Sequence, residues 1–234
     1  MFALDQSIIF PSADYADGSG LLAVGGDLSV ERLLAAYRGG IFPWYGPGLP
    51  ILWYSPDPRG VLRPQDLKVS KSLAKSLRKM NFRITTDSDF SAVIQACARA
   101  IRPGQDGTWI VPDMIEAYEE MFEAGFAHSV EVWEGDTLVG GLYGISLGGA
   151  FFGESMFHTR TDASKVALVY LVEYLKSLHF DFIDCQQVTG HLERMGASAW
   201  SRAQFLEELN TTLDRPDHVG PWTYDPQLLT TVFG

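Results

Sequence analysis

The second half of the chain passes from alternating apolar and polar residues to a continuous apolar run and then to a short apolar segment. Alternation of period two between tight turns predicts β-strands, and the longer apolar run has the length and spacing of a buried helix. A strand joined through a helix to another strand of the same sheet gives a parallel, right-handed crossover. We therefore expect an α+β domain on a mixed sheet, with strands at Ala127–Glu134, Thr137–Ser146, Ala150–Phe157 and Phe180–Gln186 and a helix at Ala163–Leu178.

The first 60 residues differ from the rest, because glycine and proline interrupt them repeatedly. One short helix is predicted at Val30–Arg38, since Ser29 can cap its first turn and Gly39 can end it. We interpret residues 1–60 as a small, loop-rich N-terminal domain and residues 61–234 as the larger domain. Further helices are predicted at Ser70–Met80, Asp89–Ala100, Pro112–Ala124, Thr189–Met195 and Ser201–Leu213.

Charge is unevenly distributed along the chain. The net charge is −11, yet the segment Arg59–Arg83 holds eight basic residues and one acidic residue, so the rest of the chain carries −18. Within that segment Lys71, Lys75 and Arg78 fall on one face of the predicted helix, opposite its leucines. Such a face is often only a solvated surface, but a basic island on an acidic chain also favours local binding of a polyanion.

Composition and spacing exclude several classes of protein. No apolar run reaches the ~18 residues of a membrane span, and the N-terminus lacks the basic start of a secretory signal, so we expect a cytoplasmic protein with no membrane attachment. The histidines and cysteines have no metal-ligand spacing, which argues against a metal site. Cys97 and Cys185 each lie in an apolar segment and are expected to be buried thiols in a reducing compartment.

Polar side chains end the last predicted strand of the sheet. Alternation puts Asp184 and Gln186 on one face of that strand, and Glu154 on the neighbouring strand could lie near Asp184. Carboxylates within an apolar sheet are costly unless they are hydrogen-bonded or functional. The three residues therefore form either a satisfied structural network or part of a catalytic site.

Large aromatic rings gather in the glycine- and proline-rich loops. Trp44 and Trp53 lie in the N-terminal region, and Trp109 lies in a separate turn. Loop tryptophans are usually packing anchors, and their main functional alternative is stacking on a nucleobase. Next to a basic helix, that alternative points to nucleic acid.

Three antiparallel strands, a helix and a parallel strand form the core arrangement of the GNAT acyltransferases. A member that uses coenzyme A would carry a glycine-rich loop between the strand and the long helix. Here that connection, Phe157–Ala163, contains no glycine, so we do not expect coenzyme A as the acyl donor. A donor with a polyanionic backbone and a terminal base would use the basic helix and the tryptophans.

Seven motifs, in the same order, resemble those of the leucyl/phenylalanyl-tRNA–protein transferase family over nearly the whole chain. So many long motifs rarely match in one order by chance. The motifs are Gly20–Ser29, Gly40–Trp44, Trp53–Arg59, Gly107–Ile110, His128–Trp133, Phe152–Phe157 and Ile183–Gln186.

The resemblance implies a cytoplasmic enzyme with a GNAT-type C-terminal domain and a small N-terminal domain. It would move leucine, phenylalanine or, as a further donor, methionine from aminoacyl-tRNA to the N-terminal Arg or Lys of a protein and so mark that protein for degradation. No cofactor is implied, and we expect a monomer.

The resemblance also assigns roles to particular residues. Trp44 and Trp109 would hold the 3′-terminal adenosine, and Glu154 would help to position the aminoacyl end. Thr189 stands where some relatives have asparagine. The side-chain pocket for the aminoacyl group would be lined by Leu142, Phe151, Leu168, Leu171 and Ile183, all of which could equally be ordinary core residues.

An aminoacyl ester is already activated, so positioning of the attacking amine can supply much of the catalysis without a metal or a covalent nucleophile. We expect Gln186 to accept a hydrogen bond from that amine while Asp184 polarises or orients it, with the proton leaving through the tRNA ribose hydroxyl or water. The basic acceptor residue would be drawn to Glu154, Asp184 or another carboxylate. Lys71, Lys75 and Arg78 would bind the tRNA backbone.

Two other functions remain open from the sequence. An N-acetyltransferase that uses acetyl-CoA would suit the strand order but not the missing glycine loop. A non-catalytic RNA-binding module would suit the basic helix and the tryptophans but gives no role to Glu154, Asp184 and Gln186.

Overall fold

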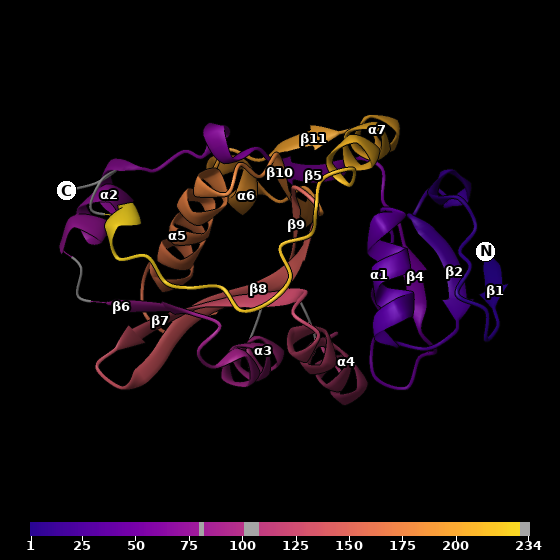
Figure 1. Cartoon of the computed structure of the whole chain (residues 1–234), viewed down its shortest axis with the longest axis horizontal. Coiled ribbons are helices and arrows are strands. Elements are labelled where there is room, and N and C mark those ends of the chain that lie inside the picture. The colour runs from indigo at the N-terminus through magenta and orange to yellow at the C-terminus, as the bar shows by residue number, and fades with distance from the viewer. Residues whose placement is uncertain (80–81, 101–107, 230–234) are drawn as a thin grey trace.

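The computed structural model describes residues 1–79, 82–100 and 108–229. Within these residues the strands form two sheets, which Figure 1 shows side by side with the smaller, N-terminal one at one end of the molecule. The smaller sheet has the order β1 (Phe2–Leu4), β2 (Leu21–Gly25), β4 (Leu52–Tyr54), β3 (Phe42–Pro43). The larger sheet has the order β11 (Ser198–Trp200), β5 (Arg59–Leu62), β10 (Phe182–Gln186), β9 (Ala150–His158), β8 (Thr137–Leu147), β7 (Ala127–Glu134), β6 (Arg83–Thr86).

The mixed sheet expected from the sequence forms the centre of the larger sheet. Strands β7, β8 and β9 are antiparallel, and β10 runs parallel to β9 with Ile183 opposite Phe151. The helix between those parallel strands is α5 (Ala163–Ser177). The predicted α+β class, with the strand and helix order that suggested a GNAT-like domain, is confirmed.

The remaining helices also follow the predicted pattern, with ends that differ by at most one residue. Met80, the last residue of the predicted basic helix, lies outside the described residues. The helices are α1 (Val30–Arg38), α2 (Lys71–Lys79), α3 (Phe90–Arg99), α4 (Pro112–Glu123), α6 (Gly190–Arg194) and α7 (Arg202–Thr212).

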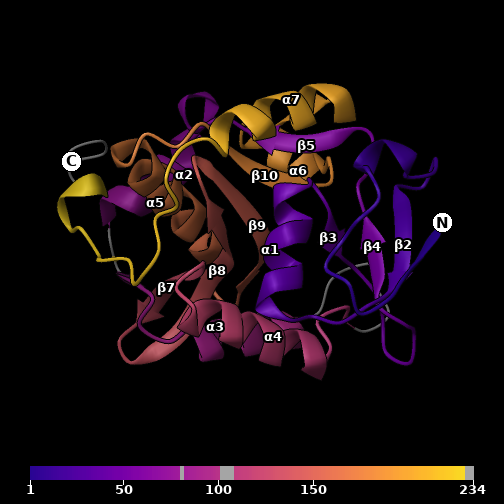
Figure 2. The same cartoon turned by 45° about the vertical axis from the view of Figure 1, so that its right-hand side comes forward.

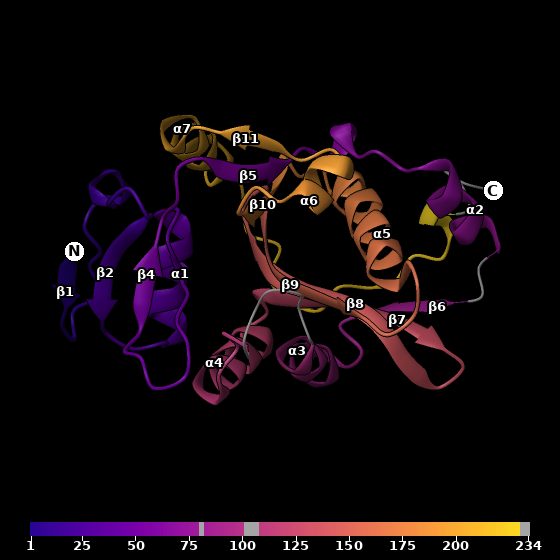
Figure 3. The ribbon, with the colours of Figure 1, turned by 180° about the vertical axis from the view of Figure 1, so that it is seen from behind.

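Two apolar cores cover the two faces of the larger sheet. Figure 3 shows α5 over one face and α3 with α4 over the other. The face under α5 packs with the leucines of α2, whereas the opposite face packs with α3, α4 and the N-terminal segment. Because α5 is buried around most of its surface, its apolar residues do not form a single stripe.

Sequence patterns did not predict strand β5. It lies in the larger sheet between β10 and β11 and pairs antiparallel with both, and all four of its residues are buried. The prolines just before it resemble loop sequence, and four residues are too few to establish a period. The short strands of the N-terminal sheet were missed for the same reason. The N-terminal region, which the sequence predicted to be rich in loops, therefore contains more β-sheet than expected.

Helix α1 lies on the side of the smaller sheet that faces the larger one, as Figures 1 and 2 both show. Ser29 caps it by accepting the backbone N–H of Arg32, as predicted. The Tyr37 ring packs against Phe152 of β9, with ring centroids 5.1 Å apart. The N-terminal segment therefore contacts the strand that carries Glu154. No helix in the described part of the chain is both long and apolar enough to cross a membrane.

Candidate active site

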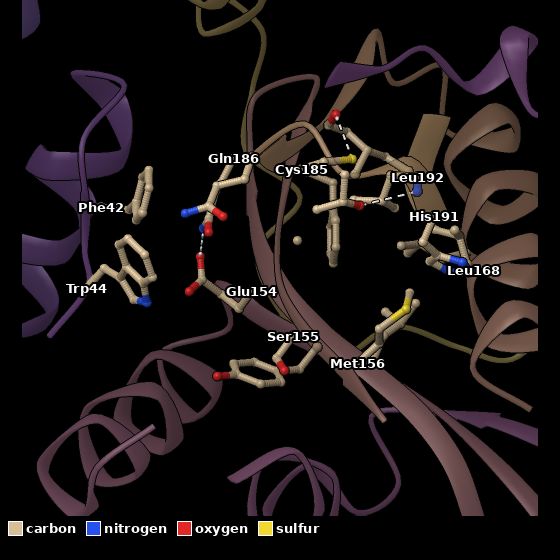
Figure 4. Close-up of a pocket in the computed structure, with 18 of the residues that line it drawn as sticks. Phe42, Trp44, Glu154, Ser155, Met156, Leu168, Cys185, Gln186, His191 and Leu192 are labelled. Atoms are coloured by element: carbon tan, nitrogen blue, oxygen red, sulfur yellow. Dashed lines mark hydrogen bonds between the residues drawn. The ribbon is translucent and has the colours of Figure 1, made fainter. Parts of the chain in front are cut away.

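A cavity of about 650 Å³ opens beside the middle of β9 and the C-terminal end of β10. Figure 4 shows its walls, with Trp44 and Phe42 on one side and Leu168 and His191 on the other. Of the residues predicted to contact substrate, it brings together Trp44, Trp109, Leu142, Phe151, Glu154, Leu168, Leu171, Ile183 and Gln186, together with Thr189. Asp184, Lys71, Lys75 and Arg78 are not in its wall.

One half of the cavity is apolar. Its wall comes from four elements, β8, β9, α5 and β10, and Met156 adds a flexible side chain to it. The five predicted pocket residues are each less than 5% exposed, so the wall is continuous with the core under α5. An aliphatic or aromatic side chain of a ligand would gain apolar burial there.

The other half of the cavity is organised around Glu154. Tyr37 donates its hydroxyl hydrogen to Glu154 Oε1 at 2.7 Å, and Tyr118 of α4 donates to Oε2 at 3.0 Å. Gln186 donates from Nε2 to Oε1 at 2.7 Å. The two tyrosine hydroxyl oxygens also contact each other, and because each hydroxyl has one hydrogen, a bond between them competes with one of the bonds to the ionised Glu154. Side chains from α1, α4 and β10 therefore hold the carboxylate that β9 carries.

A β-bulge explains how Glu154 reaches this position. In the β8–β9 ladder Tyr143 pairs with Ser155 and Gly144 pairs with Gly153, so Glu154 has no partner on β8. The extra residue changes the alternation, and Met156 packs in the core under α5 whereas Phe152 packs in the opposite core. Regular alternation would put Phe152, Glu154 and Met156 on one face of β9, and the bulge separates them.

Burial dominates the acid–base character of Glu154. Removal from water raises the pKa of its carboxyl group to about 7, although the hydrogen bonds from Tyr37 and Tyr118 act in the opposite direction. The nearby charge of Asp184 raises the same pKa further, and the Gln186 amide lowers it. Glu154 can thus gain or lose a proton near neutral pH.

Gln186 also lies at an irregular point in its strand. Its φ angle is +60°, and the β5–β10 register shifts between Asp184 and Gln186. A Cβ atom on Gly60 of β5 would lie 2.4 Å from the carbonyl oxygen of Gln187, so only glycine permits this close approach. The amide of Gln186 consequently faces Glu154 and the cavity, and its Oε1 is left to accept a hydrogen bond from a ligand.

Asp184 faces away from the cavity, which corrects the expectation that it shares a face with Gln186. Arg59 donates from Nε to its Oδ1 at 2.8 Å and from Nη2 to its Oδ2 at 2.6 Å, and both side chains are fully buried. Asp184 Oδ1 also accepts the backbone N–H of Gln186 at 2.8 Å. Strand alternation failed here because the bulge turns Gln186 toward the opposite side.

Arg59 joins several parts of the structure through this ion pair. Its guanidinium lies 4.9 Å from the centroid of Phe42 and 4.4 Å from that of Phe205, and it donates to the carbonyl oxygen of Gly40 at 3.1 Å. Asp184 is thus part of a buried network that fixes the backbone of Gln186.

The tryptophans separate into two groups. Trp44 and Trp109 are half-buried in the cavity wall, where part of each ring remains accessible for stacking. Trp53 is fully buried and donates from Nε1 to the carbonyl oxygen of Gly25, so it is a packing anchor. Thr189 is exposed at the cavity edge and caps α6 by accepting the N–H of Leu192.

The basic helix α2 has the two faces expected from its sequence. Leu73 and Leu77 are each 1% exposed, whereas Lys71, Lys75 and Arg78 are exposed. The three cations lie outside the cavity wall, on a helix that packs against α5.

Sequence patterns missed three residues of the site. Tyr37 and Tyr118 both occupied apolar positions of helices and gave no sign of being more than core residues. Arg59 was counted only as part of the basic island, although it is buried. The signal that could have found it is the unbalanced carboxylate of Asp184 in an apolar strand, which requires a cation.

Metal ligands do not gather in this site. Among residues 1–79, 82–100 and 108–229, no three His, Cys, Asp or Glu side chains are grouped in a way that could hold a metal ion. Cys97 is buried and Cys185 is half-buried, and neither forms a disulfide.

Comparison with known proteins relates both parts of the chain to one family. Residues 61–210 match the family model of leucyl/phenylalanyl-tRNA protein transferase, and residues 26–57 match the model of that protein's N-terminal domain. A relative from Anaeromyxobacter sp. (strain Fw109-5), named leucyl/phenylalanyl-tRNA–protein transferase, is 57% identical over 96% of each chain.

Other relatives agree in length as well as in sequence. The protein of the same name from Legionella pneumophila (strain Paris) is 53% identical, and the match covers 95% of this chain and 100% of that protein.

Among solved structures, a GCN5-related N-acetyltransferase from Kribbella flavida matches with a TM-score of 0.40 and 10% identity, over 72% of this chain and 60% of that one.

Proposed function

Because this chain belongs to the leucyl/phenylalanyl-tRNA–protein transferase family, whose members transfer aminoacyl groups from tRNA to proteins, we propose a specific reaction for its cavity. The enzyme transfers leucine, phenylalanine or methionine from aminoacyl-tRNA to the N-terminal Arg or Lys of a protein in the cytoplasm. The transfer creates a new N-terminal residue that marks the protein for degradation. One observation carries the proposal, namely that a single cavity joins an apolar pocket to the Glu154–Gln186 pair.

The apolar half receives the side chain of the aminoacyl group. Leu142, Phe151, Leu168, Leu171 and Ile183 offer no polar group to such a side chain, so they favour leucine, phenylalanine and methionine over polar amino acids. The neighbouring Met156 can change its rotamer to fit side chains of different shape.

The terminal adenosine stacks on the accessible rings of Trp44 and Trp109. Stacking on an aromatic ring contributes about 1–3 kcal/mol per base and holds the ester bond at the boundary between the apolar and polar halves. The exposed cations Lys71, Lys75 and Arg78 on α2 bind the phosphate backbone of the same tRNA.

The acceptor binds on the Glu154 side, because Glu154 is the one carboxylate among the described residues of the cavity wall. Its charge attracts the cationic N-terminal residue of the acceptor. A pKa of about 7 is close to that of an α-amino group, so Glu154 can take the proton that the ammonium must lose before it attacks. Gln186 Oε1 then accepts a hydrogen bond from the neutral amine and aligns its lone pair.

The reaction needs no covalent enzyme intermediate. The amine nitrogen attacks the ester carbonyl carbon, a C–N bond forms and the C–O bond to the ribose breaks. The ribose oxygen leaves with the proton that Glu154 took from the ammonium, and the nitrogen releases its second proton to Glu154 or water as the amide forms. Cys185 is the thiol of the cavity wall, and burial raises its pKa to about 12, so its nucleophilic thiolate form is scarce at neutral pH.

Asp184 acts in this reaction through Gln186. It fixes the backbone N–H of Gln186 and is itself fixed by Arg59, so we assign it a positioning role and assign the contact with the reacting amine to Gln186. We also propose that the protein acts as a monomer.

The proposal is tested with leucyl-tRNA labelled on the amino acid and three peptides that differ only in an N-terminal Arg, Lys or Ala. We expect label on the Arg and Lys peptides and none on the Ala peptide. Gln186→Leu should slow transfer about 10²-fold, whereas Gln204→Leu, an exposed change on α7, should leave its rate unchanged. If the tRNA binds but no peptide is labelled, the chain is an RNA-binding module. Acetylation of the peptides from acetyl-CoA would instead indicate an acetyltransferase.

A further inference from the structure

Beyond α7 the chain runs back along the larger sheet as an irregular segment. Residues 214–225, which we call the C-terminal strap, contain no helix or strand. Figure 1 shows them in yellow, running from α7 toward α2. The proposed function has given this segment no role.

Hydrogen bonds to the larger domain hold the C-terminal strap in place. Asp217 accepts the backbone N–H of Gly148, in the turn between β8 and β9, at 2.8 Å. The backbone N–H of Asp225 donates to the hydroxyl oxygen of Tyr170 on α5, also at 2.8 Å. Trp222 lies between these two attachments.

The backbone of Trp222 is fixed independently of its side chain. Its N–H donates to Asp87 Oδ2 at 2.7 Å, and its carbonyl oxygen accepts the hydroxyl hydrogen of Thr86 at 3.2 Å. Asp87 is itself held by the backbone N–H of Ser129 at 2.8 Å. Within the described part of the chain the indole N–H of Trp222 has no hydrogen-bond partner, so the ring acts through its size and shape.

The Trp222 ring packs between the sheet and α5. It stacks on His128 of β7, with ring centroids 3.9 Å apart and planes 6° apart, and it lies 5.0 Å from Tyr174 of α5. Its third neighbour is Phe151 of β9, at 5.7 Å between centroids. Phe151 lines the cavity and Trp222 does not, so the Trp222 ring lies one layer behind the wall of the apolar pocket.

The Phe151 ring occupies space that a missing side chain leaves on β8. Gly144 of β8 pairs with His128, and a Cβ atom on Gly144 would lie 2.6 Å from Cε1 of Phe151. Phe151 therefore rests against the strand backbone and against the buried ring of Trp222. Because protein interiors are closely packed, these two neighbours limit where the Phe151 ring can lie.

We propose that Trp222 is a positioning residue that sets the preference of the pocket between leucine and phenylalanine. It holds Phe151 in the cavity wall and so limits the depth that the donor side chain can use. The inference rests on the proposed function, because it takes the apolar half of the cavity as the site of the aminoacyl side chain. One methylene more or less in an apolar pocket changes selectivity by about 10- to 200-fold, so a small movement of Phe151 is measurable.

The test compares leucyl-adenosine with phenylalanyl-adenosine, two donors that differ only in the amino-acid side chain. Trp222→Leu leaves space into which Phe151 can retreat, so the ratio of kcat/KM for phenylalanyl-adenosine to that for leucyl-adenosine should rise about tenfold. Trp222→Phe keeps an aromatic ring and should stay closer to the wild-type ratio. An unchanged ratio in Trp222→Leu would overturn the proposal.

A double variant shows whether Trp222 acts through Phe151. Phe151→Leu should itself raise the ratio, because it enlarges the pocket directly. Adding Trp222→Leu should then raise it no further, since the ring through which Trp222 acts is gone. Effects that multiply in the double variant would show that Trp222 does not act through Phe151.

Trp200→Leu is the matched control. Trp200 is 6% exposed and Trp222 is 7% exposed, but Trp200 packs against Phe182 in the core on the opposite face of the sheet. Trp200→Leu should lower the melting temperature about as much as Trp222→Leu and should leave the ratio of the two donors unchanged. The same change of ratio in both variants would indicate a general loss of packing and would overturn the role of Trp222.

A binding measurement separates this inference from the proposed function. Adenosine analogues that carry leucine or phenylalanine through a 3′-amide, in place of the ester, bind without transfer. The ratio of their dissociation constants should shift toward phenylalanine in Trp222→Leu. If the wild type transfers from no donor but this ratio shifts, the proposed function fails and the role of Trp222 stands. If the wild type transfers leucine and neither ratio shifts in the variant, only the role of Trp222 fails.

Discussion

Arg59 and Asp184 form a fully buried ion pair in which both carboxylate oxygens accept hydrogen bonds, at 2.8 and 2.6 Å. The pair lies directly behind Gln186, whose backbone N–H also binds Asp184. Removing one partner of such a pair leaves an uncompensated charge in the interior, at a cost of about 3–5 kcal/mol.

Asp184→Asn should therefore reduce both stability and turnover. Asparagine can still accept the Gln186 N–H but cannot neutralise Arg59, so we expect a loss of about 3 kcal/mol in urea unfolding and a lower kcat in the folded fraction. The affinity for leucyl-tRNA should stay close to that of the wild type. Arg59→Met combined with Asp184→Leu should recover stability without recovering kcat. Full turnover by Asp184→Asn would contradict the role given to this pair.

Gln186→Leu should lower kcat by about 10²-fold and change the KM for leucyl-tRNA little, because Gln186 contacts the attacking amine and not the tRNA. Steady-state kinetics with an N-terminal Arg peptide measure both constants. A raised KM for leucyl-tRNA at unchanged kcat would indicate that Gln186 binds the donor instead.

Activity should rise with pH through the titration of Glu154. Since burial raises its pKa to about 7, the carboxylate that accepts the amine proton forms between about pH 6 and 8. The acceptor amine adds a second step near its own pKa of about 8. In Glu154→Gln, kcat/KM should be low and should keep only the second step. A wild-type profile that is flat between pH 6 and 8 would rule out Glu154 as the base.

The same raised pKa affects stability. Between about pH 4.5 and 7 the folded protein holds a proton on Glu154 that the unfolded chain has lost, so stability falls as pH rises through this window, by about 3 kcal/mol in total. Glu154→Gln should remove this slope, which urea unfolding at a series of pH values measures. An unchanged slope in the variant would mean that another group titrates.

Tyr37→Phe and Tyr118→Phe each remove a hydrogen bond that favours the ionised form of Glu154. The pKa of Glu154 should rise in both variants, so the lower inflection of the kcat/KM profile should move to higher pH. Tyr143→Phe is the comparison, because Tyr143 packs against Tyr118, while the hydrogen bonds to Glu154 come from Tyr37, Tyr118 and Gln186. The same displacement in Tyr143→Phe would point to a general effect of packing.

Replacing Lys71, Lys75 and Arg78 together by alanine should weaken tRNA binding. The slope of the logarithm of the binding constant against the logarithm of the salt concentration should become shallower by about 0.7–0.9 for each phosphate that loses its cation. Filter binding at several salt concentrations measures the slope. Because the leucines of α2 are untouched, the melting temperature should stay within a few degrees. An unchanged slope would move the tRNA site to another surface.

Much of the larger domain could be predicted from its sequence, because its strands and helices are long enough to establish a period. Helix α1 and strand β7 begin and end at the predicted residues, and the parallel pairing of β9 with β10 follows from the helix between them. Short strands such as β5 could not be found, since four residues carry too little pattern.

The sequence predicted which residues belong to the candidate site better than it predicted how those residues are arranged. Each of the predicted aromatic and apolar contacts lies in the cavity wall, but Asp184 does not. Strand alternation assumes regular pairing, and the irregularities at Glu154 and Gln186 break that assumption at the residues that matter most. The contacts of Tyr37 and Arg59 depend on pairing between distant segments, which one sequence does not reveal.

Tyr37 comes from the N-terminal segment and yet donates a hydrogen bond to Glu154 in the larger sheet, while Arg59 binds the carbonyl oxygen of Gly40. The two parts of the molecule thus share one site. Neither part can be exchanged between relatives or recombined without the other. We expect a chimaera joined near residue 57 to fold, because each half is intact, but to surround the Glu154 carboxylate with residues that do not match it.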